Sequence, residues 1–152
     1  MNDVAPELAK ALEGDSEILR MFGISIEKAE PGQCHLSCVV PAALVNAGGF
    51  GHGNIAFTLM DTACAYAIRA SGKRGVTSNA NVTYTKGVVA GSELRAEASI
   101  LTQTKRVITL RAETYIFEEA QSPAARSGSA SSVPELSLSA HGSFVFQLRS
   151  HP

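Results

Sequence analysis

Hydrophobic and polar positions alternate along this chain with two different periods, and the periods predict its elements. Residues 5–14 and 16–22 have the spacing of short amphipathic helices, and residues 55–70 form a long and strongly apolar helix. Extended runs are predicted on both sides of the long helix, at 24–29, 34–40, 76–85, 94–103, 107–118 and 136–149. The predicted order is therefore a helical lead-in over residues 1–22, two strands, one helix and four strands.

The connections between these runs predict how the strands pair. The pair Pro31-Gly32 favours a type II turn, which makes a hairpin of the first two strands. Residues 87–91 and 104–106 are short connections, so we expect the strands on either side of each to pair as antiparallel hairpins. Residues 119–135 are almost all small, polar or helix-breaking, and they are predicted to form a flexible loop before the last strand.

The long helix indicates the architecture. It is apolar on nearly every side, which is typical of a helix that is buried on most of its surface. An antiparallel sheet can bury one helix in this way if it curls around it. We therefore expect an α+β protein of the hotdog fold, with residues 1–152 forming a single domain.

Composition and charge exclude several classes of protein. Hydrophobic residues make up 45% and charged residues 18% of the chain, and the formal net charge is −1. No cluster of basic and aromatic residues resembles a nucleic-acid surface, so we expect no nucleic-acid partner. The acidic N-terminus does not resemble a secretory signal, and no apolar run is long enough to cross a bilayer. We expect a cytoplasmic protein that has no membrane partner.

The cysteine and histidine positions predict neither a disulfide nor a metal site. Cys34 and Cys38 are four residues apart on one strand face, about 13 Å at the rise of a strand, which is too far for a disulfide. We expect reduced thiols that pack in the core. The four histidines are scattered without the spacing of metal ligands. No metal and no cofactor is expected.

Asp61 is the first candidate for chemistry. It is the only acidic or basic residue between His52 and Arg69, so it lies in the middle of the apolar helix. An unpaired buried carboxylate costs several kcal/mol, so Asp61 must receive hydrogen bonds, face a cavity, or both. A core polar group that is bonded to a threonine or to the backbone remains an alternative at this point.

The segment before the helix is the second candidate. It contains Gly48, Gly49, Gly51 and Gly53, which allow the backbone to approach a ligand closely. Free N–H groups at a helix N-terminus can bind an anion or a developing oxyanion. A glycine-rich cap that binds no ligand is the alternative. A dinucleotide motif is excluded, because Asn54 stands where the third glycine would be needed.

These two candidates together resemble a known family. Asn46, five residues, His52-Gly53 and then Asp61 nine residues after His52 resemble hotdog-fold acyl-CoA thioesterases of the phenylacetyl-CoA (phenylacetate-pathway) type. The resemblance covers about residues 22–147 and includes the strand segments NVTYTKG (81–87) and GSFVF (142–146). Asn54 departs from it, because a second glycine is usual there.

The resemblance implies a role for each site residue. Asp61 would be the general base or the nucleophile that acts on the thioester, and the Gly53 N–H would be the oxyanion donor. Asn46 would orient the attacking water or the thioester, His52 would fix the loop, and Thr77 would help to position the water. A turn-forming Asn46, a loop-packing His52 and a surface Thr77 remain the alternatives.

The spacing of Asp61 and Gly53 predicts an oligomer. The two residues are eight positions apart, about 12 Å along a helix axis, so one chain cannot easily present both to one carbonyl. A two-fold homodimer solves this problem if Asp61 of one subunit faces Gly53 and Asn46 of the other, and a homotetramer would be a pair of such dimers. The family resemblance also implies this dimer.

The expected partner is an acyl-CoA substrate with an aryl or medium-chain acyl group. Its phosphates could meet basic residues at the ends of predicted elements, and the candidates are Lys86, Lys105, Arg106, Lys73 and Arg74. Solvated surface charges are the alternative for each of them. Two other functions are alternatives to hydrolysis. A hotdog dehydratase or hydratase usually carries a proline in this loop and helix, and none lies between Asn46 and Asp61. A non-catalytic acyl-CoA-binding protein would not need Asp61.

Overall fold

The computed structural model describes residues 5–118 and 135–149. Two short helices, α1 (Pro6–Gly14) and α2 (Ser16–Phe22), form the predicted lead-in. Helix α2 ends at Gly23, whose φ of 63° is the left-handed conformation that favours glycine at a helix end. The loop predicted at 119–135 lies almost entirely outside the described residues.

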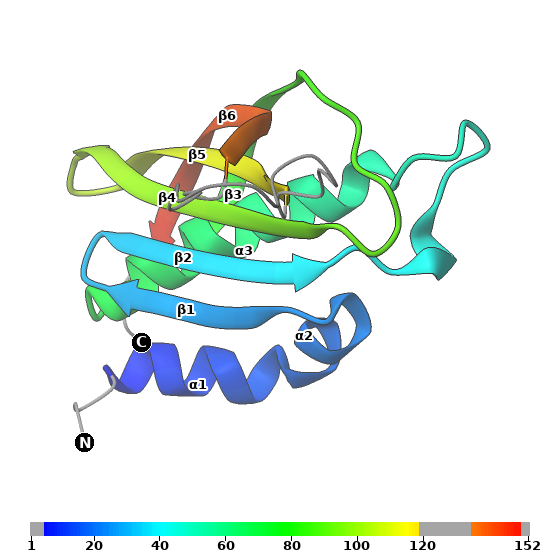
Figure 1. Cartoon of the computed structure of the whole chain (residues 1–152). Coiled ribbons are helices and arrows are strands. Elements are labelled where there is room, and N and C mark those ends of the chain that lie inside the picture. The colour runs from blue at the N-terminus through cyan, green and yellow to red at the C-terminus, as the bar shows by residue number, and fades with distance from the viewer. Residues whose placement is uncertain (1–4, 119–134, 150–152) are drawn as a thin grey trace, which may run out of the picture.

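One antiparallel sheet curls around one long helix, α3 (Gly53–Ala70), as Figure 1 shows. The strands are β1 (Ser25–Glu30), β2 (Gln33–Val39), β3 (Arg74–Tyr84), β4 (Glu93–Gln103), β5 (Val107–Glu118) and β6 (Glu135–Arg149). They lie in the order β1-β2-β4-β5-β6-β3, and a short 3-10 helix, η1 (Ala42–Leu44), follows β2. The element order and the curled sheet predicted from the pattern are confirmed.

The core lies between α3 and the inner face of the sheet. Leu94, Ala96 and Ala98, which stand at alternate positions of β4, are buried in this core. The lead-in also belongs to this packing, since the Tyr66 hydroxyl of α3 is buried and donates a hydrogen bond of 3.1 Å to Asp15. No helix of the described residues is long and apolar enough to span a membrane.

The first hairpin and the thiols agree with the sequence. Gly32 has a φ of 84°, as the third residue of a type II turn requires, and β1 pairs with β2. Cys34, Cys38 and Cys64 are all free and buried. Burial raises the pKa of Cys34 to about 12 and that of Cys38 to about 11, so both are neutral thiols that pack in the core.

The hairpin expected across residues 87–91 is wrong. Strand β3 pairs with β6 at the edge of the sheet, and β4 lies between β2 and β5. The connection runs across the sheet: the N–H groups of Thr85 and Lys86 donate to Ser139 of β6, and the Val40 N–H after β2 donates to Ser92. A short connection limits how far apart the strand ends lie and does not decide whether the strands pair. The eight residues 85–92 can reach about 26 Å when they are extended. The other predicted hairpin, β4–β5, is confirmed.

Candidate active site

Asp61 lies on a stripe of α3 that the sheet does not cover. Asn54 and Phe57 on this stripe are exposed, and Asp61 itself is half-buried. The sequence suggested a helix covered on nearly all sides, but β3 is an edge strand and leaves this stripe open. The Thr77 hydroxyl of β3 donates a hydrogen bond of 2.7 Å to Asp61 Oδ1. The carboxylate is therefore both bonded and within reach of solvent.

Two effects act on the Asp61 carboxyl in opposite directions. Burial raises its pKa above the usual value, and the hydrogen bond from Thr77 lowers it. A carboxylate with a raised pKa is a stronger base than one on an open surface. Strand β3 has an irregular register between Thr77 and Asn79, directly at this hydrogen bond.

Asn46 folds the loop before α3. Its side-chain oxygen accepts hydrogen bonds from the N–H groups of Gly48 (2.8 Å) and Phe50 (3.3 Å), and its own N–H donates to the Phe50 carbonyl (2.7 Å). Gly49 has a φ of 84°, so the turn requires glycine there. The side-chain oxygen of Asn46 thus forms the turn, as one of the two interpretations expected. The amide NH₂ group takes no part in these hydrogen bonds.

His52 is the N-cap of α3. Its Nδ1 accepts a hydrogen bond of 3.3 Å from the Asn54 N–H, and its own backbone N–H donates to the Leu44 carbonyl over 2.7 Å. A neutral imidazole that accepts at Nδ1 carries its proton on Nε2. His52 therefore joins the loop to the helix start and holds a donor on its other ring nitrogen.

A cavity of about 410 Å³ lies between this loop and residues 84–88, which begin at the last residue of β3. Asn46, His52, Gly53 and Lys86 all line it, so the structure brings these four predicted residues together. Asp61 and Thr77 are not among the lining residues. The predicted site is therefore divided within one chain into a carboxylate with its threonine and a separate cavity at the helix N-terminus.

Two aromatic residues that sequence reasoning gave no role also line the cavity, Phe50 and Tyr84. A Cβ atom on Gly53 would stand 3.3 Å from the Tyr84 ring, so the glycine lets this ring reach the helix start. Tyr84 falls within the segment NVTYTKG that carried the resemblance, and Phe50 within the glycine-rich loop. The sequence thus placed both residues within segments that were expected to form a site. Only the packing shows that their rings form the walls of the cavity.

Lys105 and Arg106 lie far from this cavity. They form the exposed β4–β5 turn, which is at the left of Figure 1, whereas the loop before α3 projects at the right. Other basic residues gather near the turn: the Leu148 N–H donates to the Arg106 carbonyl, and Arg149 is the cross-strand neighbour of Arg74. The structure thus separates Lys86 from the other two predicted phosphate ligands.

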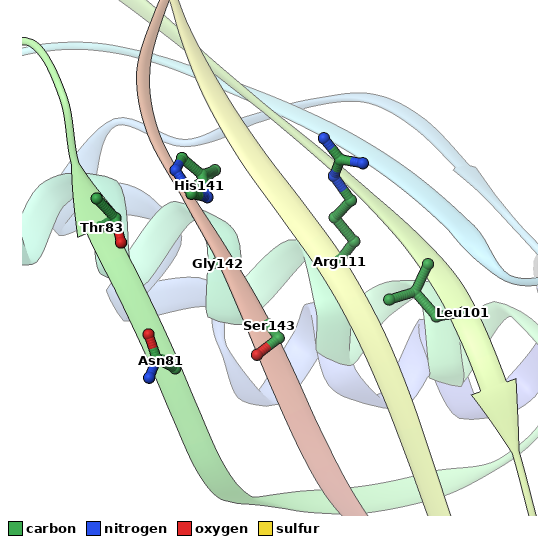
Figure 2. Close-up of a pocket in the computed structure, with 7 residues that line it drawn as sticks. All are labelled: Asn81, Thr83, Leu101, Arg111, His141, Gly142 and Ser143. Atoms are coloured by element: carbon green, nitrogen blue, oxygen red, sulfur yellow. The ribbon is translucent and has the colours of Figure 1, made fainter.

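A second hollow of about 300 Å³ lies on the outer face of the sheet, as Figure 2 shows. Arg111 and His141 line it, and Arg111 alternates with Leu110 and Ala112, which are buried toward α3. The Arg111 guanidinium is already paired with Glu113. This hollow is on the face of the sheet away from Asp61 and has no part in that site.

The Cys64 thiol on α3 is not a second nucleophile beside Asp61. Cys64 lies one turn further along α3, and burial, assisted by the nearby Asp61 charge, raises its pKa well above the usual value. It is therefore a neutral thiol and a poor nucleophile. In the described part of the chain no three His, Cys, Asp or Glu side chains are grouped so that they could hold a metal ion.

Comparison with known proteins places this geometry in a family. The model of the thioesterase superfamily matches residues 48–122. A protein of Halobacterium salinarum that is named as a putative esterase is 34% identical over 107 residues, which are 65% of this chain and 70% of that protein. The acyl-coenzyme A thioesterase PaaI of Escherichia coli is 29% identical over 106 residues, 70% of this chain and 76% of that protein.

Solved structures share the architecture. The structure of Escherichia coli PaaI superposes with a TM-score of 0.77 at 23% identity, over 97% of this chain and 99% of that one. A hypothetical thioesterase protein of Streptococcus pneumoniae with coenzyme A has a TM-score of 0.75 at 19% identity, over 93% and 97% of the two chains. This chain belongs to the thioesterase superfamily and is a thioester hydrolase with the hotdog fold.

Proposed function

We propose that this protein hydrolyses acyl-CoA thioesters with an aryl or medium-chain acyl group to the free acid and CoA. The observation that carries the proposal is the half-buried Asp61 carboxylate, which is oriented by Thr77 on an otherwise apolar helix. The Escherichia coli relative is an acyl-coenzyme A thioesterase, and the Streptococcus pneumoniae neighbour holds coenzyme A, which supports this substrate class.

Asp61 supplies the attacking group in the proposed reaction. As a general base it takes a proton from water while the oxygen bonds to the thioester carbon, and as a nucleophile it forms an anhydride that water then cleaves. In either case the carbonyl oxygen becomes an oxyanion, which the Gly53 N–H at the start of α3 stabilises. Collapse of the intermediate breaks the C–S bond and releases the CoA thiolate. In the proposed reaction the Asn46 amide and the His52 Nε2–H donate further hydrogen bonds, since both residues line the same cavity.

We propose that the working site is shared between two copies of the chain. Asp61 and Gly53 of one chain are eight residues apart on α3, about 12 Å along its axis, and the cavity beside Gly53 does not include Asp61. Strand β3 lies at an edge of the sheet, and two copies of it related by a two-fold axis would run antiparallel to each other. Such pairing would bring the Thr77 end of one β3 to the Tyr84 end of the other, and Asp61 toward Gly53 of the second copy.

The same two-fold arrangement would unite the separated basic residues. It would move the Lys105–Arg106 turn of one copy toward the cavity of the other, because the turn lies at the opposite end of the sheet from the loop before α3, which lines the cavity. The exposed side chains of Lys105 and Arg106 would then meet the phosphates of CoA, with Lys86 closer to the thioester.

Release of free CoA thiol from a panel of acyl-CoA substrates tests the proposal. Asp61→Asn should lower kcat by about several hundredfold or more, because it removes the base or nucleophile and keeps the shape. The variant should melt no lower than the wild type, since a half-buried charge is replaced by a neutral amide of the same size.

Three outcomes would contradict the proposal. If the wild type releases no thiol from any member of the panel, the substrate class is wrong. If it converts an enoyl or hydroxyacyl thioester without releasing thiol, a dehydratase or hydratase is indicated. If Asp61→Asn keeps near-wild-type turnover, the assignment of Asp61 is wrong.

A further inference from the structure

Two segments of the chain face each other across the cavity, and each contributes one aromatic ring and one glycine. The ring of each segment lies against the glycine of the other. Residues 50–53 contribute Phe50 and Gly53, and residues 84–87 contribute Tyr84 and Gly87. The Tyr84 ring lies against Gly53, and the Phe50 ring lies against Gly87. The cavity therefore has a Tyr84 end beside the start of α3 and a Phe50 end three residues away along both segments.

The contact at the Phe50 end is very close. A Cβ atom on Gly87 would stand 2.7 Å from Phe50 Cδ1, a distance that real Cβ atoms essentially never show, and 3.1 Å from Cε1. Gly87 is not in the left-handed region, so its backbone does not require glycine. The structural reason for glycine at this position is the ring that rests on it.

Phe50 is held in place from its own side as well. Its N–H is bonded to the Asn46 side chain and its carbonyl to the Asn46 N–H, and the Gly51 N–H after it donates 2.7 Å to the Val88 carbonyl. The ring is 49% exposed, so it forms a wall of the cavity and is not a core residue. A half-exposed ring that rests on a glycine can be displaced or removed without opening the core.

The chemistry at this end suits a hydrocarbon. Phe50 and Val88 are apolar, and Gly51 contributes only backbone. The Lys86 ammonium is bonded to the Ser137 hydroxyl over 3.0 Å, and the exposed basic turn lies at the other end of the sheet. If the thioester carbonyl is bound at Gly53, as the proposed function requires, the group that extends toward Phe50 is the acyl group and not the CoA phosphates.

We propose that Phe50, seated on Gly87, is the residue that limits the length of the acyl group. Acyl chains that fit between Gly53 and the ring are accepted, and longer chains collide with it. This inference rests on the proposed function, and it identifies the preferred substrates as acyl groups that are short or compact enough to end at the ring.

The test is kcat/KM for CoA release along the series butanoyl-, hexanoyl-, octanoyl-, decanoyl- and dodecanoyl-CoA. In the wild type it should decline beyond a certain length. Phe50→Ala should move that limit to longer chains and raise the ratio of dodecanoyl to butanoyl activity by about tenfold or more. Val89→Ala is the matched control, because Val89 is 53% exposed in the same connection and does not line the cavity.

Gly87→Ala provides a second, independent variant. Its new methyl group should push the Phe50 ring away, which the exposed ring can accommodate, and so change the length profile by itself. In the Phe50→Ala background the same substitution meets no ring, so it should have almost no effect. The two substitutions are therefore expected to be strongly non-additive.

The possible failures are distinguishable. If the wild type hydrolyses no acyl-CoA, the proposed function has failed and not this inference alone. If Phe50→Ala changes all chain lengths by the same factor, the ring contacts the pantetheine arm or only the loop, and the inference is wrong. It is also wrong if Gly87→Ala acts equally in both backgrounds, or if Val89→Ala shifts the profile as Phe50→Ala does.

Discussion

At the scale of single residues, the proposed mechanism makes the pH range of activity depend on the pair Asp61 and Thr77. Burial raises the pKa of Asp61, and the hydroxyl of Thr77 holds it down. A base acts only when it is deprotonated, so activity should fall as the pH drops through this raised pKa. The position of the acid limb therefore reports directly on the hydrogen bond between the two residues.

Thr77→Val should move the acid limb of kcat/KM to higher pH. The substitution removes the bond that lowers the pKa of Asp61 and leaves the burial that raises it, so the carboxyl is deprotonated only at higher pH. Thr77→Ser, which keeps a hydroxyl, should leave the limb close to that of the wild type. A pH–rate profile of the three proteins checks this, and an acid limb unmoved in Thr77→Val would separate Thr77 from the function of Asp61.

Asn46 has two chemical groups that substitutions can separate. Asn46→Asp keeps an oxygen to accept the N–H groups of Gly48 and Phe50 but has no amide donor, so it should fold like the wild type and lose activity. Asn46→Ala loses the turn as well and should be about 1 kcal/mol less stable. Melting temperature and kcat are measured on both variants. An active Asn46→Asp protein would show that Asn46 only forms the turn.

At the scale of elements, the position of β3 matters most, because this strand carries Thr77 and ends beside the cavity. It is held only by β6 within the sheet, and Gly142 of β6 faces Val82 of β3 in the register. A Cβ atom on Gly142 would stand 2.5 Å from the backbone oxygen of Asn81. The Asn81 oxygen belongs to the backbone and cannot move away by a change of rotamer, so glycine is required at position 142 for the two strands to pair.

Gly142→Ala should therefore destabilise the protein by about 1–3 kcal/mol, the usual cost of overpacking, and displace β3 from its partner. Its melting temperature should fall together with thioesterase activity. Gly14→Ala is the matched control, since Gly14 ends α1 with nothing near the position of a Cβ and no left-handed backbone. Equal melting temperatures of the two variants would mean that β3 tolerates a shift.

At the scale of the whole molecule, the separation of Asp61 from the cavity predicts complementation between two defective chains. When Asp61→Asn and Asn46→Asp chains are co-expressed, a heterodimer holds one site with both lesions and one site with neither. Activity should return to about half of the wild-type value per dimer, because a two-fold axis exchanges the chains between the sites.

The purified heterodimer is compared with each homodimer by thiol release. Both homodimers should be nearly inactive, since every site in them lacks either the carboxylate or the amide. A heterodimer as inactive as its parents would place all catalytic groups within one chain, and the shared site proposed here would be wrong. A protein that remains monomeric at assay concentration would contradict it as well.

The sequence alone determined the features that depend on local spacing. The strands and helices repeat with periods that are visible within ten to fifteen residues, and the isolated carboxylate in an apolar helix identified Asp61 as a candidate. The cluster of Asn46, His52 and Gly53 lies within eight residues, so its grouping followed from the chain itself. These predictions required no knowledge of which distant residues meet.

Only the tertiary structure decided the features that depend on distant contacts. The partner of β3 was predicted wrongly, because a short connection fixes the distance between strand ends and not their pairing. The separation of Asp61 from Gly53 within one chain followed from their spacing along the helix. The contact of Phe50 with Gly87 and the hydrogen bond between Thr77 and Asp61, in contrast, were not visible in the sequence. Such features arise when segments far apart in the chain are packed together, and no local period records that packing.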